Sequence, residues 1–177
     1  MYIFGGWNGV SPNNDLYTYD FATQVWDQVY YYGTPPTPRC SHAAVVSEKH
    51  KCMFVFGGYG GRSYKYLNDM CVYHFETNTW TVCKNSPMSP RSRMRVVEFD
   101  DKIYLYGGWN SVDHFNNLYQ YDIETGRWSE LDLDLAGKIG QHSMVIYNNI
   151  LYIFGGYNSD TKTSTNDLYA YRLSKPL

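Results

Sequence analysis

Four Gly-Gly pairs that are each followed by a Trp or a Tyr recur at nearly equal intervals along this 177-residue chain. Each pair follows a short run of aliphatic and aromatic residues that favours a β-strand, and each precedes a Trp or a Tyr. The pairs are Gly5-Gly6, Gly57-Gly58, Gly107-Gly108 and Gly155-Gly156, separated successively by 52, 50 and 48 residues. A repeat of this length indicates four similar supersecondary units that pack against one another.

A Tyr follows each glycine pair, and in three units a Trp stands seven residues after that Tyr. The Tyr residues are Tyr19, Tyr73, Tyr121 and Tyr171, and the Trp residues are Trp26, Trp80 and Trp128. This pattern resembles the Kelch motif. The resemblance covers the whole chain and implies an all-β fold, a partial or truncated Kelch-type β-propeller whose blades have four antiparallel strands.

We name the four expected strands of a unit a to d in chain order. Strand b precedes the glycine pair, strand c carries the repeated Tyr, and strand d begins at the repeated Trp. Turn residues such as Asp100-Asp101 separate the strands, and no helix is predicted. Expected strands include 53–56, 69–75, 79–83, 94–99, 103–106 and 117–123.

The unit boundaries are 1–32 (strands b to d), 33–85 (a to d), 86–134 (a to d) and 135–177 (a to c). Three interpretations of the incomplete first and last units stay open. The chain is part of a longer propeller or a shortened one, it closes a ring of four blades, or two chains close one ring together. Incomplete blades expose apolar faces and unpaired strand edges, so we expect the isolated chain to self-associate.

Composition and motifs argue against several function classes. A net charge of −2 and the lack of a long apolar run predict neither a nucleic-acid nor a membrane partner. His42 and His142 occupy matching positions, but the intervening unit has Met94 there, so we predict no metal and no cofactor. A G-x-S-x-G nucleophile motif is absent, as is the Glu-x₃-Asp-x₃-His pattern of iron-dependent specifier proteins. We therefore predict that the protein is not an enzyme.

The four cysteines show no CxxC spacing. Aligning the units places Cys71 and Cys83 at packing positions, where a thiol behaves as a small hydrophobe. We expect all four thiols to be reduced, which favours a cytoplasmic location, with the nucleus as the alternative.

The third unit carries Arg91, Arg93 and Arg95 at alternating positions of its strand a region. Two interpretations of Arg91 and Arg93 stay open. Their guanidinium groups either bind a carboxylate or phosphate ligand or form ion pairs within the blade. For Arg95 we favour an internal ion pair.

In the resembled fold, the b–c and d–a loops emerge on one face, and here they are long and differ in every unit. Binding residues concentrate on such loops. The predicted partner-binding residues are Arg62, Tyr64, Trp109 and His114, supported by Arg91 and Arg93. For Trp109 the alternative is packing beneath its own loop.

The resemblance implies a protein-interaction module, a scaffold or adaptor. Its finer alternatives are substrate recognition for a ubiquitin ligase and association with the cytoskeleton, and the sequence does not identify the partner. The alternative from another class is a small-molecule-binding, carbohydrate-binding or enzymatic propeller that uses the aromatic residues of the loops.

Overall fold

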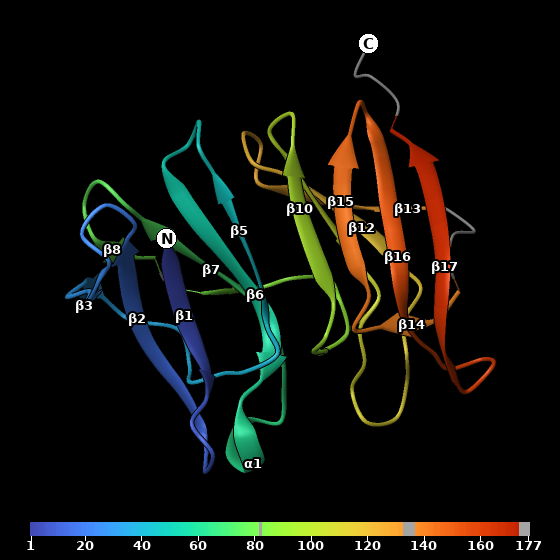
Figure 1. The fold of residues 1–177 in the computed structure, drawn as a ribbon, viewed down its shortest axis with the longest axis horizontal. Coiled ribbons are helices and arrows are strands. Elements are labelled where there is room, and N and C mark those ends of the chain that lie inside the picture. Colours follow the sequence, from blue (N-terminus) through green and yellow to red (C-terminus); the bar gives the residue numbers. More distant parts are fainter. Residues whose placement is uncertain (82, 133–136, 174–177) are drawn as a thin grey trace. The chain divides into compact units, whose positions relative to one another are not determined.

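The computed structural model describes residues 1–81, 83–132 and 137–173 and divides into two compact units, Met1–Pro90 and Arg91–Leu177. The described residues form β-sheets and one single-turn helix, α1 (Gly61–Tyr64) (Figure 1). The strand pairings are antiparallel, except that Tyr32–Gly33 pairs in parallel with Thr79–Trp80. This architecture confirms the predicted all-β fold of blade-like sheets. Among the described residues, no helix has the length and apolar character needed to cross a membrane.

The first unit contains two sheets. A three-stranded sheet has the order β1-β2-β3, and its strands are β1 (Tyr2–Trp7), β2 (Pro12–Asp20) and β3 (Val25–Gln28). The second sheet has the order β4-β8-β7-β6-β5, with β9 paired to β7. Its strands are β4 (Tyr32–Gly33), β5 (Ala43–Ser47), β6 (Cys52–Tyr59), β7 (Tyr66–His74), β8 (Thr79–Trp80) and β9 (Lys84–Asn85).

The second unit also contains two sheets. One has the order β10-β11-β12-β13, and the other has the order β14-β16-β15 with β17 paired to β16. The strands of the first are β10 (Arg95–Phe99), β11 (Lys102–Tyr106), β12 (Leu118–Asp122) and β13 (Arg127–Leu131). Those of the second are β14 (Ile139–Gly140), β15 (Ser143–Tyr147), β16 (Ile150–Asn158) and β17 (Thr163–Arg172).

The expected strands lie at the expected places, with two differences. Strand d of the second sheet is divided into β8 and β9, and position 82 between them lies outside the described residues. The prediction of no helix is wrong by one turn, since α1 follows Gly60 in the loop between β6 and β7. In that loop a Gly stands where the other units have an Asn.

The glycine pairs bring neighbouring strands into close contact. The pairing register shifts between Phe56 and Gly58, and Gly58 has a φ of +105°. A Cβ on Gly58 would lie 2.9 Å from the carbonyl oxygen of Cys40. The first glycine of a pair is equally confined, because a Cβ on Gly107 would lie 2.4 Å from the carbonyl oxygen of Ile139. The glycine pairs therefore have a structural role, because a residue with a Cβ would collide with the neighbouring backbone at these positions.

The seven-residue offset from Tyr to Trp is the register of the hairpin between strands c and d. Tyr19 lies opposite Trp26, Tyr73 opposite Trp80, and Tyr121 opposite Trp128. The two rings of each pair stand 4.9–5.1 Å apart. In the first unit, Trp80 also contacts Phe4 of the neighbouring sheet, with 5.0 Å between the ring centroids. The repeated aromatic residues thus join strands and, at Trp80, adjacent sheets.

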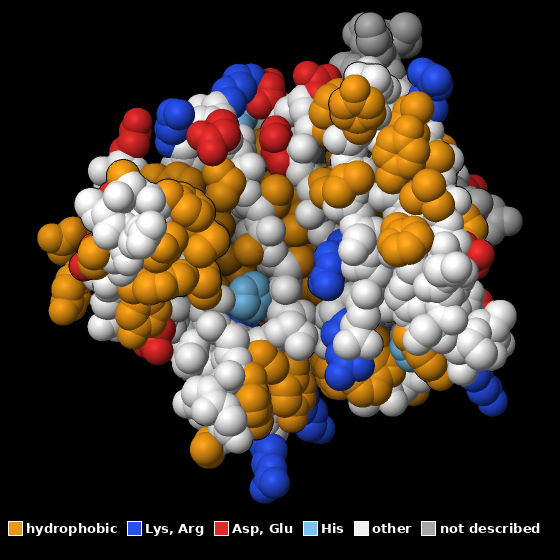
Figure 2. Space-filling model, viewed as in Figure 1, with side chains coloured by type: hydrophobic (Ala, Val, Ile, Leu, Met, Phe, Trp, Pro, Cys, Tyr) orange, Lys and Arg blue, Asp and Glu red, His pale blue; other side chains and the backbone are white. Residues whose placement is uncertain are grey.

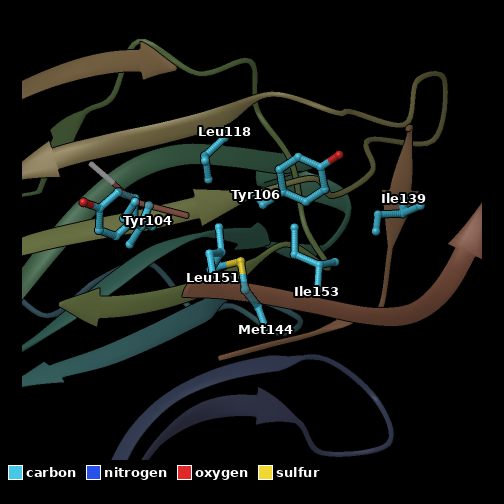
Figure 3. Close-up of a cluster of buried hydrophobic side chains, with 8 residues drawn as sticks. Tyr104, Tyr106, Leu118, Ile139, Met144, Leu151 and Ile153 are labelled. Carbon is cyan, nitrogen blue, oxygen red and sulfur yellow. The ribbon is translucent and has the colours of Figure 1, made fainter. Parts of the chain in front are cut away.

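Each unit has its own hydrophobic core. In the first unit, Phe4 and Leu16 from one sheet meet Val55, Tyr73 and Trp80 from the other. In the second unit, the core is formed by Tyr104, Tyr106, Leu118, Ile139, Met144, Leu151, Ile153 and Leu173 (Figure 3). Each core therefore draws on both sheets of its unit, which holds the loops at the sheet ends in fixed positions.

The prediction of four reduced cysteines is wrong, because Cys71 and Cys83 form a disulfide bond within the second sheet. Tyr73 of β7 pairs with Trp80 of β8, and Met70 of β7 pairs with Lys84 of β9. The register shifts by one residue between these two pairings, and this shift puts Cys83 opposite Cys71. Cys40 and Cys52 are free. The cytoplasmic expectation rested partly on free thiols, and the bond removes that support.

Candidate functional site

The b–c loops and the segments before strand a form what we call the loop face of each unit. The b–c loops are residues 8–11, 60–65, 107–117 and 159–162. In the first unit, the β1–β2 loop and α1 lie at the same end of their sheets (Figure 1). The predicted loop residues can therefore be examined as one surface in each unit.

Three of the four b–c loops are held by the side chain of an Asn. Asn8 accepts hydrogen bonds through Oδ1 from the backbone N–H groups of Val10 (3.0 Å) and Ser11 (2.8 Å). Asn110 and Asn158 make the same pair of bonds in their own loops. Such turns fix the loop backbone. Sequence reasoning missed this function, although the recurring Gly-Gly-aromatic-Asn string was its signal.

The loop face of the first unit contains a groove of about 640 Å³, which we call the Trp7 groove. Trp7 and Val10 come from the end of β1 and the loop after it, and Tyr59 and Arg62 come from the end of β6 and from α1. Pro38 lies between these two segments in sequence. Trp7 is 54% exposed and Val10 84% exposed. The groove therefore combines exposed apolar side chains with one guanidinium group.

The loop face of the second unit contains a smaller pocket of about 250 Å³, which we call the Arg93 pocket. Its lining residues are Arg93, Trp109, His114, Gly140, Gln141 and Tyr157. The guanidinium carbon of Arg93 lies 4.8 Å from the centroid of the Trp109 ring. His114 stands between Trp109 and Tyr157, with ring centroids 6.1 and 5.6 Å away.

The environment of His114 lowers the pKa of its imidazole below 6.5, chiefly through burial and then through the positive charge of Arg93. The carboxylate of Asp160 opposes this shift. The lowered pKa favours the neutral form of the His114 imidazole.

Three of the predicted binding residues, Arg93, Trp109 and His114, are brought together in one pocket. Arg62 lines the Trp7 groove in the other unit. Tyr64 lies in α1, but its side chain is outside the described part of the structure. Trp109 is half-buried, so part of its side chain packs within the fold. The same residue also lines the Arg93 pocket.

Arg91 is not on the accessible surface, since its residue exposure is 1%. Its guanidinium donates to the carbonyl oxygen of Gly107 (3.2 Å) and lies over the Phe115 ring at 3.6 Å. Burial lowers the pKa of Arg91 to about 10. Arg39, which precedes β5, likewise donates to the carbonyl oxygen of Gly57 (3.0 Å). The Pro-Arg pairs therefore brace the glycine pairs, and we leave Arg91 out of the binding surface.

Within the described residues, the side chains of Asp69, Cys71 and Cys83 form a close group of the types that bind metals. Both sulfur atoms of this group are consumed by the disulfide bond. The Asp69 carboxylate accepts two hydrogen bonds of 2.8 Å from the fully buried Arg39. The disulfide bond and the contact with Arg39 therefore explain why these three side chains lie close together.

Comparison with known proteins gives a match over residues 1–176 to the model of the KLHDC2/KLHL20/DRC7 Kelch-repeats domain. The leucine-zipper-like transcriptional regulator 1 homolog of Drosophila melanogaster is 35% identical over 62% of this chain and 12% of its own length. Host cell factor 1 of Mus musculus is 34% identical over 61% of this chain and 6% of its own length. An Arabidopsis thaliana relative, acyl-CoA-binding domain-containing protein 5, is 32% identical over 61% of the chain and 17% of its length. The chain therefore spans a small part of these relatives.

Proposed function

Because the chain belongs to the Kelch-repeat family, we propose that it is a non-catalytic protein-interaction module whose loop face binds another protein. Kelch propellers are in general protein-binding folds, so the family supports the class of function. The proposal adds the binding surface, namely the Trp7 groove and the Arg93 pocket.

The observation that carries this proposal is the gathering of aromatic and guanidinium groups on the loop face of each unit. Trp109, Arg93 and His114 line one pocket, and Trp7 and Arg62 line the other. Trp, Tyr and Arg are the side chains that most often anchor protein interfaces. Loops already held by Asn side chains lose little conformational entropy when a partner binds.

A scaffold or adaptor role is the finer part of the proposal, with ubiquitin-ligase substrate recognition and cytoskeletal association as its two forms. The names of two relatives describe transcriptional regulators of the leucine-zipper-like type, which is compatible with a regulatory adaptor. We also propose a cytoplasmic location, which cell fractionation followed by immunoblotting tests.

The test uses peptides selected on the intact protein from a displayed library of random sequences. Replacing Arg62, Tyr64 and His114 together by Ala should weaken peptide binding more than tenfold, since each change removes an anchor worth about 1 kcal/mol or more. The midpoint of thermal unfolding should be nearly unchanged, because the altered side chains lie on loops.

The matched control replaces Lys49 and Glu124, which lie in the short turns at the other ends of the strands, by Ala. Its peptide affinity should equal that of the unaltered protein. If this control loses binding while the loop variant keeps it, the partner binds the opposite face and the proposal is wrong.

A further inference from the structure

Five of the seven prolines in this chain directly follow a Ser or a Thr. Four of these dipeptides lie in two segments of the same pattern, Ser/Thr-Pro-x-Ser/Thr-Pro-Arg, at residues 34–39 and 86–91. The first segment precedes β5 and the second precedes β10. Because Pro has a fixed φ and no backbone N–H, a protein kinase can select a hydroxyl group that stands directly before it. The two segments therefore carry candidate phosphorylation sites.

The fold exposes one hydroxyl-bearing residue in each segment. In residues 34–39, Thr34 is exposed and Thr37 is half-buried. In residues 86–91 the order is reversed, since Ser89 is exposed and Ser86 is only 7% exposed. Thr34 and Ser89 both lie outside the strands, in the segments before strand a that belong to the loop face. The fold thus separates two accessible hydroxyl groups from two others that the sequence pattern treats as equal.

Hydrogen bonds to β7 explain the protection of Ser86. Its Oγ donates to the carbonyl oxygen of Asn68 at 2.6 Å, and its backbone N–H donates to the same oxygen at 2.8 Å. The side chain of Asn68 donates in turn to the carbonyl oxygen of Met88 at 3.2 Å. Met88 is buried, which anchors the chain directly before the exposed Ser89. A kinase can therefore reach Ser86 only after this segment has opened.

The fifth dipeptide, Ser11-Pro12, has an exposed Ser in a constrained turn. The N–H of Ser11 donates to Oδ1 of Asn8 at 2.8 Å, and its carbonyl oxygen accepts the N–H of Asn8 at 3.1 Å. Pro12 begins β2 and pairs with Trp7 of β1. A kinase must align the acceptor segment with ATP in its own active site, so a segment fixed in a turn reacts poorly. Ser11 is therefore a poor acceptor in spite of its exposure.

We propose that Thr34 and Ser89 are phosphorylation sites for a proline-directed protein kinase that uses ATP. The side-chain hydroxyl oxygen attacks the γ-phosphorus of ATP, the bond between this phosphorus and the β,γ-bridging oxygen breaks, and ADP leaves. The hydroxyl proton passes to the catalytic Asp carboxylate of the kinase. A phosphate monoester then remains on Thr34 or Ser89. This inference goes beyond the proposed function, because it concerns modification of the chain itself.

The modification changes the charge of the loop face. Each phosphate adds close to two negative charges at pH 7, so two phosphates bring the net charge of the chain from −2 to about −6. Like charges that meet across an interface weaken binding. A partner with an acidic contact surface should therefore bind the modified protein more weakly, a consequence that rests on the proposed function.

The experiment treats the intact protein with a mitogen-activated protein kinase, Mg²⁺ and ATP, and maps the phosphorylated residues by mass spectrometry. Synthetic peptides of residues 30–39 and 84–93 serve as unfolded references. In the peptides we expect phosphate on all four hydroxyl groups. In the intact protein, Thr34 and Ser89 should react about tenfold or more faster than Ser86, because Ser86 reacts only in the fraction of molecules that has opened locally.

Substitutions test the assignment of the two sites. Thr34→Val combined with Ser89→Ala should remove nearly all phosphate incorporation by the intact protein. The matched control, Thr37→Val combined with Ser11→Ala, should incorporate as much phosphate as the unaltered protein. Urea unfolding shows whether each variant is folded.

Three results would overturn the inference. The first is a lack of phosphate on Thr34 and Ser89 in the intact protein under conditions that modify the peptides. The second is modification of Ser86 in the intact protein as fast as that of Ser89. The third is failure of the kinase to modify the peptides. Loss of the loop-face dependence of peptide binding would refute the proposed function and leave the two phosphorylation sites in place.

Discussion

At the residue scale, the buried His142 and the half-buried His42 make stability depend on pH. The pKa of His142 is lowered from 6.5 to about 3, first by burial and then by the charge of Arg95. The pKa of His42 is lowered to about 4 by burial and by Arg39. Below pH 6.5 the unfolded chain takes up protons that these native imidazoles do not. The free energy of unfolding therefore falls as the pH drops from 6.5 towards about 4.

We predict that His142→Leu reduces this pH dependence, because Leu has no proton to gain on unfolding. Urea unfolding at about pH 7 and about pH 5 measures the slope of stability against pH, so that a general loss of stability does not affect the comparison. An unchanged slope in the variant would show that His142 is protonated in the native state.

At the element scale, the disulfide bond joins β7 to the irregular strand d of its own sheet. It closes a loop with a sequence separation of 12 residues. The bond should stabilise the protein by about 3 kcal/mol, because it reduces the conformational entropy of the unfolded chain. The double substitution Cys71→Ser and Cys83→Ser should lower the free energy of unfolding, measured in guanidinium chloride, by about this amount. Peptide mapping without reductant that finds Cys71 and Cys83 both alkylated would contradict the structure of this strand pair.

The elements also show what sequence reasoning can reach. Strands b and c were predictable because glycine pairs and Tyr residues recur at fixed spacing. The bond between Cys71 and Cys83 was not, because it depends on a one-residue shift between two short pairings. The site was predictable only as a set of loops. The stacking of Arg93 on Trp109 was not, since it depends on a close approach at Gly108, where a Cβ would lie 2.8 Å from the Ser92 carbonyl oxygen.

At the scale of the whole molecule, apolar side chains and open strand edges remain accessible. Within the described residues, β1 pairs only with β2 and β17 only with β16. Met1, Ile3 and Leu168 are exposed, and hydrophobic side chains gather over β1 and β2 (Figure 2). Self-association of the isolated chain stays a prediction, and these features are its physical basis.

The central claim, that the loop face binds the partner, is tested most directly by hydrogen exchange. Amide exchange is measured by mass spectrometry for the intact protein with and without a library-selected peptide. We predict slower exchange in the b–c loops, residues 8–11, 60–65, 107–117 and 159–162. Protection confined to the opposite turns, residues 21–24, 48–51, 75–78 and 123–126, would contradict the claim.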